Sequence, residues 1–550
     1  MVKAASVAGL LAVACILDDA AGRLVLPMNK VLNAYSYVSS AVQSDWNTKK
    51  QKVLDFVAAQ HAISQSPGWA LAVVHHNETL IAQGFGLNEV GNPANPVTQD
   101  SMFEIGSVTK TMIAVGIAKL VDEGRVAWKD PVKKHLPWFQ LKDKYAEAYT
   151  TLHDLLVMNS VFAEGDSELP TIFGVERSER EWVEKLQYFE TSRSLRQGYK
   201  YANVNFVILG QVLQEITNKT WGNYLTETIW HPLGMKHTFH NPSDTPLHTR
   251  SFGHYVCGGK IAGPFDIADT KYSVLEAFGN AAGSAVSSIH DMAIFAKFLL
   301  SKGQPLFKSS QPISDMITGH EVQLMFAGDM ATTWGYHIQP SGNTIGAGYG
   351  LDVVGNAMYN GVDYFDKNGD TMVHQTRTGF VPSQGLGIVL VNNGRQVDQN
   401  SHIQRLSHVR TYILGLLLDI PEAELKAVFD ESVRVADKTP IAPCDPYTFD
   451  HKKLEVSYVP SQTEKDWLSG EYATANSPEF YGRVAVYQKS GGLFLKYGDF
   501  EGQLVGQTNS TYSWDIGFTG THVDIQVQKS ETGRLVLPLG GDFVFHKVVG

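Results

Sequence analysis

The sequence has few cysteines, no excess of basic charge and, beyond its first residues, no long apolar run. Three cysteines, Cys15, Cys257 and Cys444, are too few for a disulfide-rich scaffold or an all-cysteine zinc site. The 45 Lys and Arg against 56 Asp and Glu give a net charge of −11, which argues against a polybasic nucleic-acid-binding protein. No later stretch holds 18 uninterrupted apolar residues, so we expect no membrane span.

The remaining composition is typical of a large globular protein. Of 550 residues, 43% are hydrophobic and 11% aromatic, enough for several packed cores, whereas disordered chains are poorer in both. At roughly 150 residues per domain, the length fits three or four units, or one large enzyme domain with an appendage.

The N-terminal segment has the pattern of a secretory signal. Residues 1–17 carry a positive start followed by an apolar run too short to cross a bilayer. We expect a signal peptide over residues 1–21 and a secreted, extracellular protein. Ala14-Cys15 also partly matches a bacterial lipoprotein box, and this alternative stays open.

Two further features bear on the compartment. Glycosylation sequons, which are compatible with a secreted glycoprotein, begin at Asn77, Asn218 and Asn509. An oxidising compartment would allow Cys257 and Cys444 to form a disulfide, and the alternative is a pair of buried thiols.

Hydrophobic patterning predicts one unit in which helices lie between strands. Residues 31–63 are predicted to be helical, and residues 69–82 to form a β-hairpin. Apolar residues at helical spacing predict a buried helix over 107–122. The apolar run 385–391 predicts a central strand, with a helix over 405–418 behind it.

The composition changes near residue 421. Residues 421–465 contain a charged helical stretch and five prolines, and we interpret them as a linker. The remaining residues, 466–550, hold short alternating strands separated by Gly- and Ser-rich turns, which predicts a small β-barrel. The predicted strands are 483–487, 493–497, 523–527, 535–537 and 543–545.

The first motif with chemical content is Ser107-Val-Thr-Lys110, at the start of the buried helix. Residues at i and i+3 share a helix face, so the lysine amine can approach the serine hydroxyl. A serine needs an adjacent base to act as a nucleophile, and lysine can serve where burial or a neighbouring cation lowers its pKa.

The second motif is Tyr201-Ala-Asn203, just before an apolar helical run. With it, the chain resembles the serine β-lactamase and D-Ala-D-Ala peptidase superfamily, in its class C β-lactamase-like branch, peptidase family S12. The blocks 67–74, 231–235 and 282–292 are each similar to a segment of that family.

The third motif requires a choice between two sequences. His374 to Gly379 ends in glycine but lies too near the following strand, so we choose Lys367-Asn368-Gly369 as the variant of the family's Lys-Thr-Gly. The motifs then start at 107, 201 and 367, in the order and at the spacing of class C-like enzymes. The resemblance covers residues 45–420.

The resemblance implies a catalytic role for three residues. Ser107 would attack a carbonyl to form an acyl-enzyme, while Lys110 and Tyr201 share the proton transfers and Lys110 keeps Tyr201 partly ionised. The resemblance further implies a substrate-binding set and an oxyanion hole made of two backbone N–H groups. The binding set is Asn203, Lys367, Asn368 and Gly369, and the N–H groups belong to Ser107 and Asp370.

Two residues depart from the family pattern. Asn368 replaces the hydroxyl-bearing residue of Lys-Thr-Gly, and Asp370 replaces a small residue. Both weigh against substrates that carry a carboxylate, because Asp370 adds negative charge where an anion would bind.

The implied fold is α/β (α+β). It comprises an antiparallel sheet flanked by helices and an all-helical lobe, followed by a lipocalin-like barrel over 466–550. The implied partner is a small-molecule or peptide substrate, with no nucleic acid, no membrane span and no cofactor. Homo-oligomers and association with the extracellular matrix stay open.

Histidines raise two alternatives. His237, His240, His248 and His254 lie within 18 residues but lack metalloprotease spacing, so we expect solvated loop histidines and no metal site. His374 could act as a base, although we expect a structural role. The rival to a serine hydrolase is a non-catalytic extracellular binding or matrix protein that keeps the fold.

Overall fold

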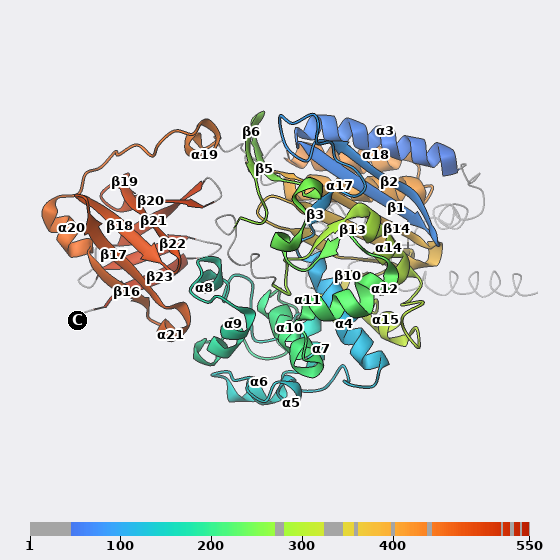
Figure 1. Ribbon diagram of the computed structural model, residues 1–550, viewed down its shortest axis with the longest axis horizontal. Coiled ribbons are helices and arrows are strands. Elements are labelled where there is room, and N and C mark those ends of the chain that lie inside the picture. The colour runs from blue at the N-terminus through green and yellow to red at the C-terminus, as the bar shows by residue number, and fades with distance from the viewer. Residues whose placement is uncertain are drawn as a thin grey trace, which may run out of the picture.

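The computed structural model describes residues 46–269, 280–323, 345–356, 361–397, 402–436, 443–518, 521–528, 533–538 and 542–548. The predicted signal peptide and Cys15 lie outside these residues. Figure 1 shows a β-barrel beside a larger unit in which a sheet lies next to a helical lobe. Mixed helices and antiparallel sheets followed by a barrel confirm the predicted fold class.

A nine-stranded sheet forms the centre of the larger unit. Its order is β2-β1-β14-β13-β11-β10-β9-β8, and β12 pairs with β13. The predicted hairpin and central strand are confirmed, because β1 pairs antiparallel with both β2 and β14. The strands are β1 (Gly68–His75), β2 (Glu78–Gly86), β8 (Glu321–Gln323), β9 (Ile345–Gly348), β10 (Leu351–Gly355), β11 (Tyr364–Asp366), β12 (Asn368–Asp370), β13 (Gln375–Val381) and β14 (Leu386–Asn392).

Helices cover both faces of this sheet. One apolar cluster joins it to α3 (Trp46–Ser64), α17 (His402–Leu417) and α18 (Glu422–Ala436), which Figure 1 shows together beside β1 and β2. A second, larger cluster joins its other face to α14 (Ile289–Leu300) and the helical lobe. Strands buried on both faces read as continuous apolar runs, which is why β14 was predictable.

The helical lobe carries the segment that contains Ser107. The helix predicted over 107–122 is confirmed as α4 (Val108–Asp122), which is buried on nearly every side. The other helices around it are α5 (Val132–His135), α6 (Lys144–Tyr149), α7 (Leu152–Leu156), α8 (Leu169–Ile172), α9 (Glu179–Lys185), α10 (Val204–Thr217), α11 (Trp221–Leu225), α12 (His231–Leu233) and α15 (Gln311–Met316).

Two three-stranded sheets complete the larger unit. One has the order β3-β7-β4, with β3 (Met102–Glu104), β7 (Val286–Ser288) and β4 (Thr238–Phe239). The other has the order β15-β5-β6, with β5 (Gly253–Cys257), β6 (Lys260–Phe265) and β15 (Gly394–Gln396). Cys257 at the end of β5 forms a disulfide with Cys444, just before α19 (Pro446–Asp450).

The segment interpreted as a linker has two parts. Its first part is α18, whose Leu425 and Phe429 are buried against the central unit, and the domain boundary at residue 420 stays a prediction. Helix α18 is strongly amphipathic. The charged residues of its exposed face dominate the composition of this segment, so the apolar residues of its buried face were not recognised in the sequence. The described residues from 443 onward run through α19 and a largely extended stretch to α20 (Gln462–Leu468).

The C-terminal unit is a closed eight-stranded barrel, as predicted. Its eight strands run in chain order around the barrel, with α21 (Pro478–Tyr481) after the first of them. The strands are β16 (Gly470–Thr474), β17 (Arg483–Lys489), β18 (Gly492–Tyr497), β19 (Phe500–Gly506), β20 (Thr511–Phe518), β21 (Thr521–Gln528), β22 (Arg534–Pro538) and β23 (Asp542–Lys547).

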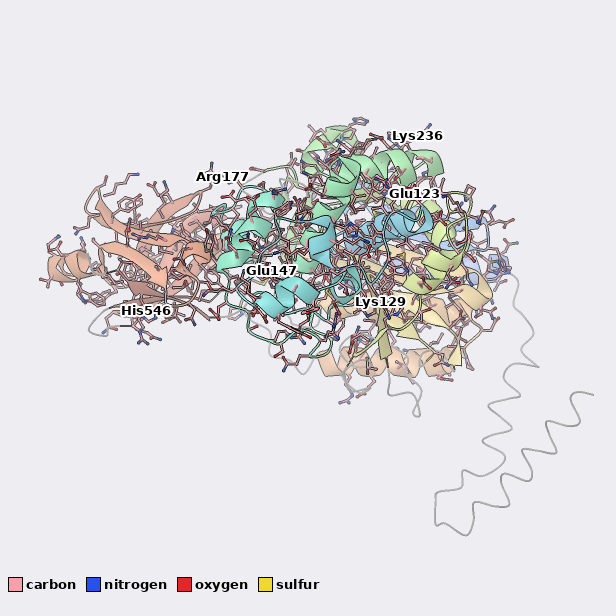
Figure 2. The ribbon with its side chains drawn as sticks, turned by 90° about the horizontal axis from the view of Figure 1, so that it is seen from below. Glu123, Lys129, Glu147, Arg177, Lys236 and His546 are labelled. Carbon is pink, nitrogen blue, oxygen red and sulfur yellow. A yellow bond between two sulfur atoms is a disulfide. The ribbon has the colours of Figure 1, made fainter. Side chains whose placement is uncertain are left out.

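The helical lobe inserts a side chain into the barrel. Phe173, directly after α8, is buried in the barrel's apolar cluster, where its ring stacks on Trp514 at 5.5 Å between centroids. The Asp499 N–H donates to the Phe173 carbonyl at 2.8 Å. Figure 1 shows α8 beside the barrel, and Figure 2 places Arg177, which pairs with Asp499, at the same junction.

Candidate active site

Ser107 lies where β3 ends and α4 begins, and its side chain is partly exposed. The preceding Gly106 has a φ of +52°, and a Cβ there would lie 2.7 Å from the Asp370 nitrogen. A Cβ on Gly369 would lie 1.9 Å from the Ile105 carbonyl oxygen. Glycine is therefore required at both positions for β12 to approach the serine. This approach brings the Asp370 nitrogen to the Ser107 segment, and the oxyanion hole stays a prediction.

Lys110 is fully buried and has three polar partners. Its Nζ lies 2.8 Å from Ser107 Oγ, 2.8 Å from Asn203 Oδ1 and 2.6 Å from the Ala282 carbonyl oxygen. A neutral amine has two N–H groups and one lone pair. Donation to the two oxygens of Asn203 and Ala282 leaves that lone pair directed at the serine hydroxyl.

Tyr201 approaches the serine from the segment before α10. Its hydroxyl donates to Ser107 Oγ at 2.7 Å. Lys367 Nζ lies 3.5 Å from the same hydroxyl and 4.7 Å from the ring centroid. Ser107, Lys110, Tyr201 and Lys367, which are far apart in the sequence, therefore form one continuous polar cluster.

The pKa values of this cluster set its resting charge. Burial lowers the pKa of Lys110 well below its usual 10.5, and the nearby Lys367 lowers it further. Burial raises the pKa of Tyr201 to about 12, although Lys367 opposes the rise. At neutral pH the stable pair is therefore a neutral phenol beside an amine whose charged form is disfavoured. Desolvation of the phenolate works against the expectation that Lys110 keeps Tyr201 partly ionised, and that expectation stays a prediction.

Lys367 is held by an acid that sequence reasoning missed. Its Nζ lies 2.5 Å from Asp352 Oδ1 on β10. Burial lowers the pKa of Lys367, but the Asp352 carboxylate and Tyr201 outweigh this, so the pKa rises and the amine stays charged. The register of β10 and β11 pairs Val353 with Asp366, which brings Asp352 opposite Lys367 one step further on. The charge of Lys367, which the resemblance places in the substrate-binding set, is thus already paired with Asp352.

Glu168 is a second acid that the motifs did not reveal. It is 5% exposed, and burial raises its pKa to about 7, while a hydrogen bond from the Asn203 side chain lowers the pKa in part. Asn203 therefore lies between Lys110 and a buried carboxyl. Glu168 directly precedes α8, so the segment that inserts Phe173 into the barrel also carries an acid to this cluster.

The Asn368 side chain contacts α17, and its expected place in the substrate-binding set stays a prediction. Its Oδ1 accepts from Arg410 Nη1 of α17 at 3.1 Å. Successive side chains of a strand point to opposite faces, so Lys367 faces the serine and Asn368 faces α17.

The carboxylate of Asp370 is also neutralised. Its two oxygens lie 3.0 and 3.2 Å from Arg377 Nη2 and Nη1, and this guanidinium is fully buried. The negative charge expected at this position is therefore compensated by Arg377. Only the backbone of Asp370 lies against the Ser107 segment.

The remaining predicted residues lie elsewhere. His374 is fully buried, accepts the Glu104 N–H through Nδ1 at 3.0 Å and, through burial, has its pKa lowered to about 3, which fits a structural role. His240 contacts the ring of Trp221, and His248 lies in an exposed turn. The ring of His254 is buried and forms hydrogen bonds with two backbone groups. The three sequon asparagines, Asn77, Asn218 and Asn509, are exposed.

Comparison with known proteins agrees with this geometry. A family model described as Beta-lactamase matches residues 53–409. The unguisins hydrolase ungD' of Aspergillus campestris (strain IBT 28561) is 29% identical over 243 residues, which are 43% of this chain and 44% of that protein. The protein flp of Staphylococcus aureus (strain MW2) is 25% identical over 194 residues, 35% of this chain and 38% of that protein. The match thus spans less than half the length of these curated relatives.

Two solved structures share the fold. The octameric penicillin-binding protein homologue from Pyrococcus abyssi aligns with a TM-score of 0.54 and 18% identity, covering 90% of this chain and 99% of that chain. The D-amino acid amidase from Ochrobactrum anthropi SV3, complexed with D-phenylalanine, aligns with a TM-score of 0.54 and 21% identity, covering 68% and 100%. At these identities the likeness establishes the fold alone. Over the residues that the structure describes, no helix is long and apolar enough to span a bilayer.

Proposed function

The chain belongs to the beta-lactamase family, and we propose that it is an S12-type serine hydrolase that cleaves amide or ester carbonyls through an acyl-enzyme on Ser107. The observation that carries this proposal is the environment of Lys110. A buried amine with a depressed pKa, two N–H groups donated to oxygens and a serine hydroxyl 2.8 Å away is a base prepared to activate that serine.

The proposed reaction starts with a neutral Lys110. As Ser107 Oγ bonds to the carbonyl carbon, its proton passes to Lys110 Nζ and the carbonyl oxygen becomes an oxyanion beside the backbone N–H groups of Ser107 and Asp370. Collapse of the tetrahedral intermediate breaks the bond to the leaving group, which takes the Tyr201 proton. Lys367 stabilises the transient Tyr201 phenolate, and the proton held by Lys110 restores the phenol.

Hydrolysis of the acyl-enzyme reverses these proton transfers. Water gives its proton to the amine–phenol pair as it attacks the acyl carbon, and Ser107 Oγ recovers a proton when it leaves. The same two groups therefore act as base and acid in turn, which requires that neither is permanently ionised.

The charges around the cluster favour substrates without a carboxylate. Lys367 is paired with Asp352, so its positive charge is not freely available to an anion, whereas the Asp370 carboxylate and Arg377 neutralise each other. The carboxylates of Asp352 and Glu168 also act on Lys110. We therefore expect a neutral or amine-bearing acyl group. A relative named as a hydrolase of unguisins supports hydrolysis within the family, not a particular substrate.

The test is covalent labelling of the purified protein with a fluorophosphonate and, separately, with a labelled penicillin. We expect a fluorophosphonate adduct that maps to Ser107 and is absent from Ser107→Ala. Ser383→Ala, which changes an exposed serine, is the matched control and should label like the wild type. Folded wild-type protein without an adduct from either probe would overturn the proposal in favour of the non-catalytic binding or matrix protein.

We propose in addition that the protein is secreted. The expected signal peptide over residues 1–21, the Cys257–Cys444 disulfide and the three exposed sequons support this proposal. Mass spectrometry of protein from the culture medium should show an N-terminus after the signal. A full-length chain retained in the cytosol would contradict it.

A further inference from the structure

The small sheet β3-β7-β4 has two ends with different chemistry. At one end, β3 leads to Ser107, and the chain entering β7 supplies the Ala282 carbonyl that holds Lys110. The other end brings together Asp100, His237 and His290. Asp100 comes two residues before β3, His237 directly before β4, and His290 two residues after β7. Antiparallel pairing of both β3 and β4 with β7 brings these positions together.

The three side chains offer ligand atoms that converge. One atom from each lies within 4.8 Å of the others, and His237 Nδ1 is 3.4 Å from Asp100 Oδ1. Zinc–nitrogen and zinc–oxygen bonds of about 2.0 to 2.2 Å in a tetrahedron separate neighbouring ligand atoms by about 3.3 to 3.5 Å. The observed separation is therefore that of two ligands on one ion.

His237 Nδ1 has an unmet need for a partner. The atom is inaccessible to solvent and, in the part of the chain that the structure describes, makes no hydrogen bond. Asp100 is close enough in distance but does not meet the angular requirement of a hydrogen bond. His237 Nδ1 and Asp100 Oδ1 thus lie close together without forming a hydrogen bond, which is the arrangement of two ligands that bind one ion.

A buried carboxylate orients the His290 ring and holds the backbone of His237. Asp291 is 1% exposed, and its Oδ1 lies 3.1 Å from His290 Nδ1, which leaves Nε2 of that ring as the ligand atom. Its Oδ2 accepts the backbone N–H of His237 at 2.6 Å and the Thr238 hydroxyl at 2.9 Å. A carboxylate that receives the second ring nitrogen of a histidine is the usual support of a metal-binding imidazole.

The backbone fixes the same three segments. The His290 N–H donates to the Gln99 carbonyl at 3.1 Å, beside Asp100. The Ser288 N–H donates to the His237 carbonyl at 3.1 Å. The segments that carry the three ligands are therefore held in place by the fold.

We propose that Asp100, His237 and His290 bind one divalent transition-metal ion, for which zinc is the best match. Two imidazoles and one carboxylate are ligands that zinc accepts, and a fourth, tetrahedral position stays open to water because all three side chains are partly exposed. The ion joins the three strands at the end of the sheet opposite Ser107. It therefore restrains the strands that lead to the nucleophile and to the Ala282 carbonyl. This role is structural and does not depend on the proposed hydrolysis.

The sequence predicted no metal site, because a metal site was expected only among histidines that are close together in the sequence. Of the histidines between 237 and 254, only His237 joins the site, and its partners lie 137 residues before and 53 residues after it. Ligands separated by such distances leave no local spacing pattern.

The experiment measures metal binding directly. The full chain is stripped with a chelator, dialysed, and titrated with Zn²⁺ by calorimetry, and its visible spectrum is recorded with Co²⁺. We expect one Zn²⁺ per chain, tetrahedral Co²⁺ absorption bands and a higher melting temperature with Zn²⁺. His237→Ala and the near-isosteric Asp100→Asn should each weaken Zn²⁺ binding at least 100-fold and abolish the shift in melting temperature.

His248→Ala is the matched control, because it removes an exposed histidine from the same stretch of sequence. It should bind Zn²⁺ like the wild type. Circular dichroism and the melting temperature of the stripped proteins establish that Asp100→Asn is folded. Wild-type protein that binds no Zn²⁺, or variants at Asp100 and His237 that bind it as tightly as the wild type, would overturn the proposal.

Discussion

The cluster around Ser107 and the interior of the barrel are both buried, yet opposite kinds of side chain fill them. The cluster contains two lysines and a carboxyl, Lys110, Lys367 and Glu168, whose pKa values are shifted by burial. The barrel is filled by apolar and aromatic side chains such as Leu495 and Trp514. Desolvated polar groups reduce stability and gain reactivity, whereas close-packed apolar groups increase stability and are unreactive. The chemistry therefore belongs to the first region and the packing energy to the second.

The two regions meet in one short segment. Glu168 lies beside the Asn203 that binds Lys110, and Phe173 lies inside the barrel. The barrel thus holds in place the segment that carries Glu168. This is a structural role for the barrel, and it requires no ligand in the barrel. Substitutions in the two regions should have different signatures, one in turnover and the other in stability.

The largest expected effect is on turnover, from Lys110→Met. Loss of a general base typically reduces the rate by about 10² to 10⁴-fold, so we expect kcat/KM to fall about 10³-fold. The free energy of unfolding should change by less than about 1.5 kcal/mol, because the apolar stem is retained and the cost of desolvating the amine is removed. Kinetics and chemical denaturation measure the two quantities.

Lys119→Met on the same helix is the control, since Lys119 pairs with Glu123 at i,i+4 and lies over the Phe307 ring. It should leave kcat/KM within about twofold of the wild type. A Lys110→Met enzyme with wild-type kcat/KM would remove Lys110 from the mechanism.

The next effect is on stability, from Phe173→Ala. Truncation of a buried phenylalanine costs about 3 to 5 kcal/mol, and this one stacks on Trp514 at the end of the barrel. We expect the free energy of unfolding to fall by that amount and kcat/KM to change less than it does in Lys110→Met. Tyr145→Ala, at a 61% exposed aromatic, should change stability by less than about 0.5 kcal/mol. An equal, small loss in both variants would show that the barrel does not depend on Phe173.

Much of both regions was predictable from local pattern. Ser107 with Lys110, and Tyr201 with Asn203, lie on single helix starts, where fixed spacing determines which side chains meet. The barrel strands β17 and β18 show the required alternation. Strands β16, β19 and β20 were missed, because glycine and polar outward-facing residues interrupt their apolar pattern.

The acids of the site could not be predicted in the same way. Asp352 reaches Lys367 only through the pairing of β10 with β11, and Glu168 reaches Asn203 only because α8 is anchored in the barrel. Neither contact has a sequence spacing that could reveal it. The orientation of Asn368 toward Arg410 likewise follows from strand alternation, once the strand is placed.

A third prediction concerns the pH dependence of stability. Burial raises the pKa of Glu168 from its usual 4.5 to about 7, so between these values the folded protein binds more protons than the unfolded chain. The free energy of unfolding should therefore fall as pH rises from about 4.5 to 7. Glu168→Gln should remove the share of this fall that Glu168 causes and be more stable than the wild type by about 3 kcal/mol at pH 8. Glu176 and Glu179, whose pKa values burial raises to about 7 and about 8, should keep the rest of the fall.

Denaturation curves at several pH values measure this difference. Glu164→Gln, at an exposed acid four residues earlier, should keep the wild-type pH dependence. If Glu168→Gln also keeps it, the carboxyl is ionised in the folded protein at pH 5, and the contrast between the polar cluster and the barrel is weaker than the structure indicates.

The smallest expected effect tests why the site disfavours anionic substrates. Asp352→Asn removes the carboxylate that pairs with Lys367 but keeps a side chain of nearly the same shape. The freed charge should lower KM for carboxylate-bearing substrates about 5- to 10-fold, or roughly 1 to 1.4 kcal/mol, and leave KM for neutral substrates unchanged. Asp363→Asn, which changes an acid directly before β11 that accepts the Ser383 backbone N–H, should change neither KM. An equal change for both substrate classes would mean that Asp352 positions Lys367 for Tyr201 rather than masking its charge.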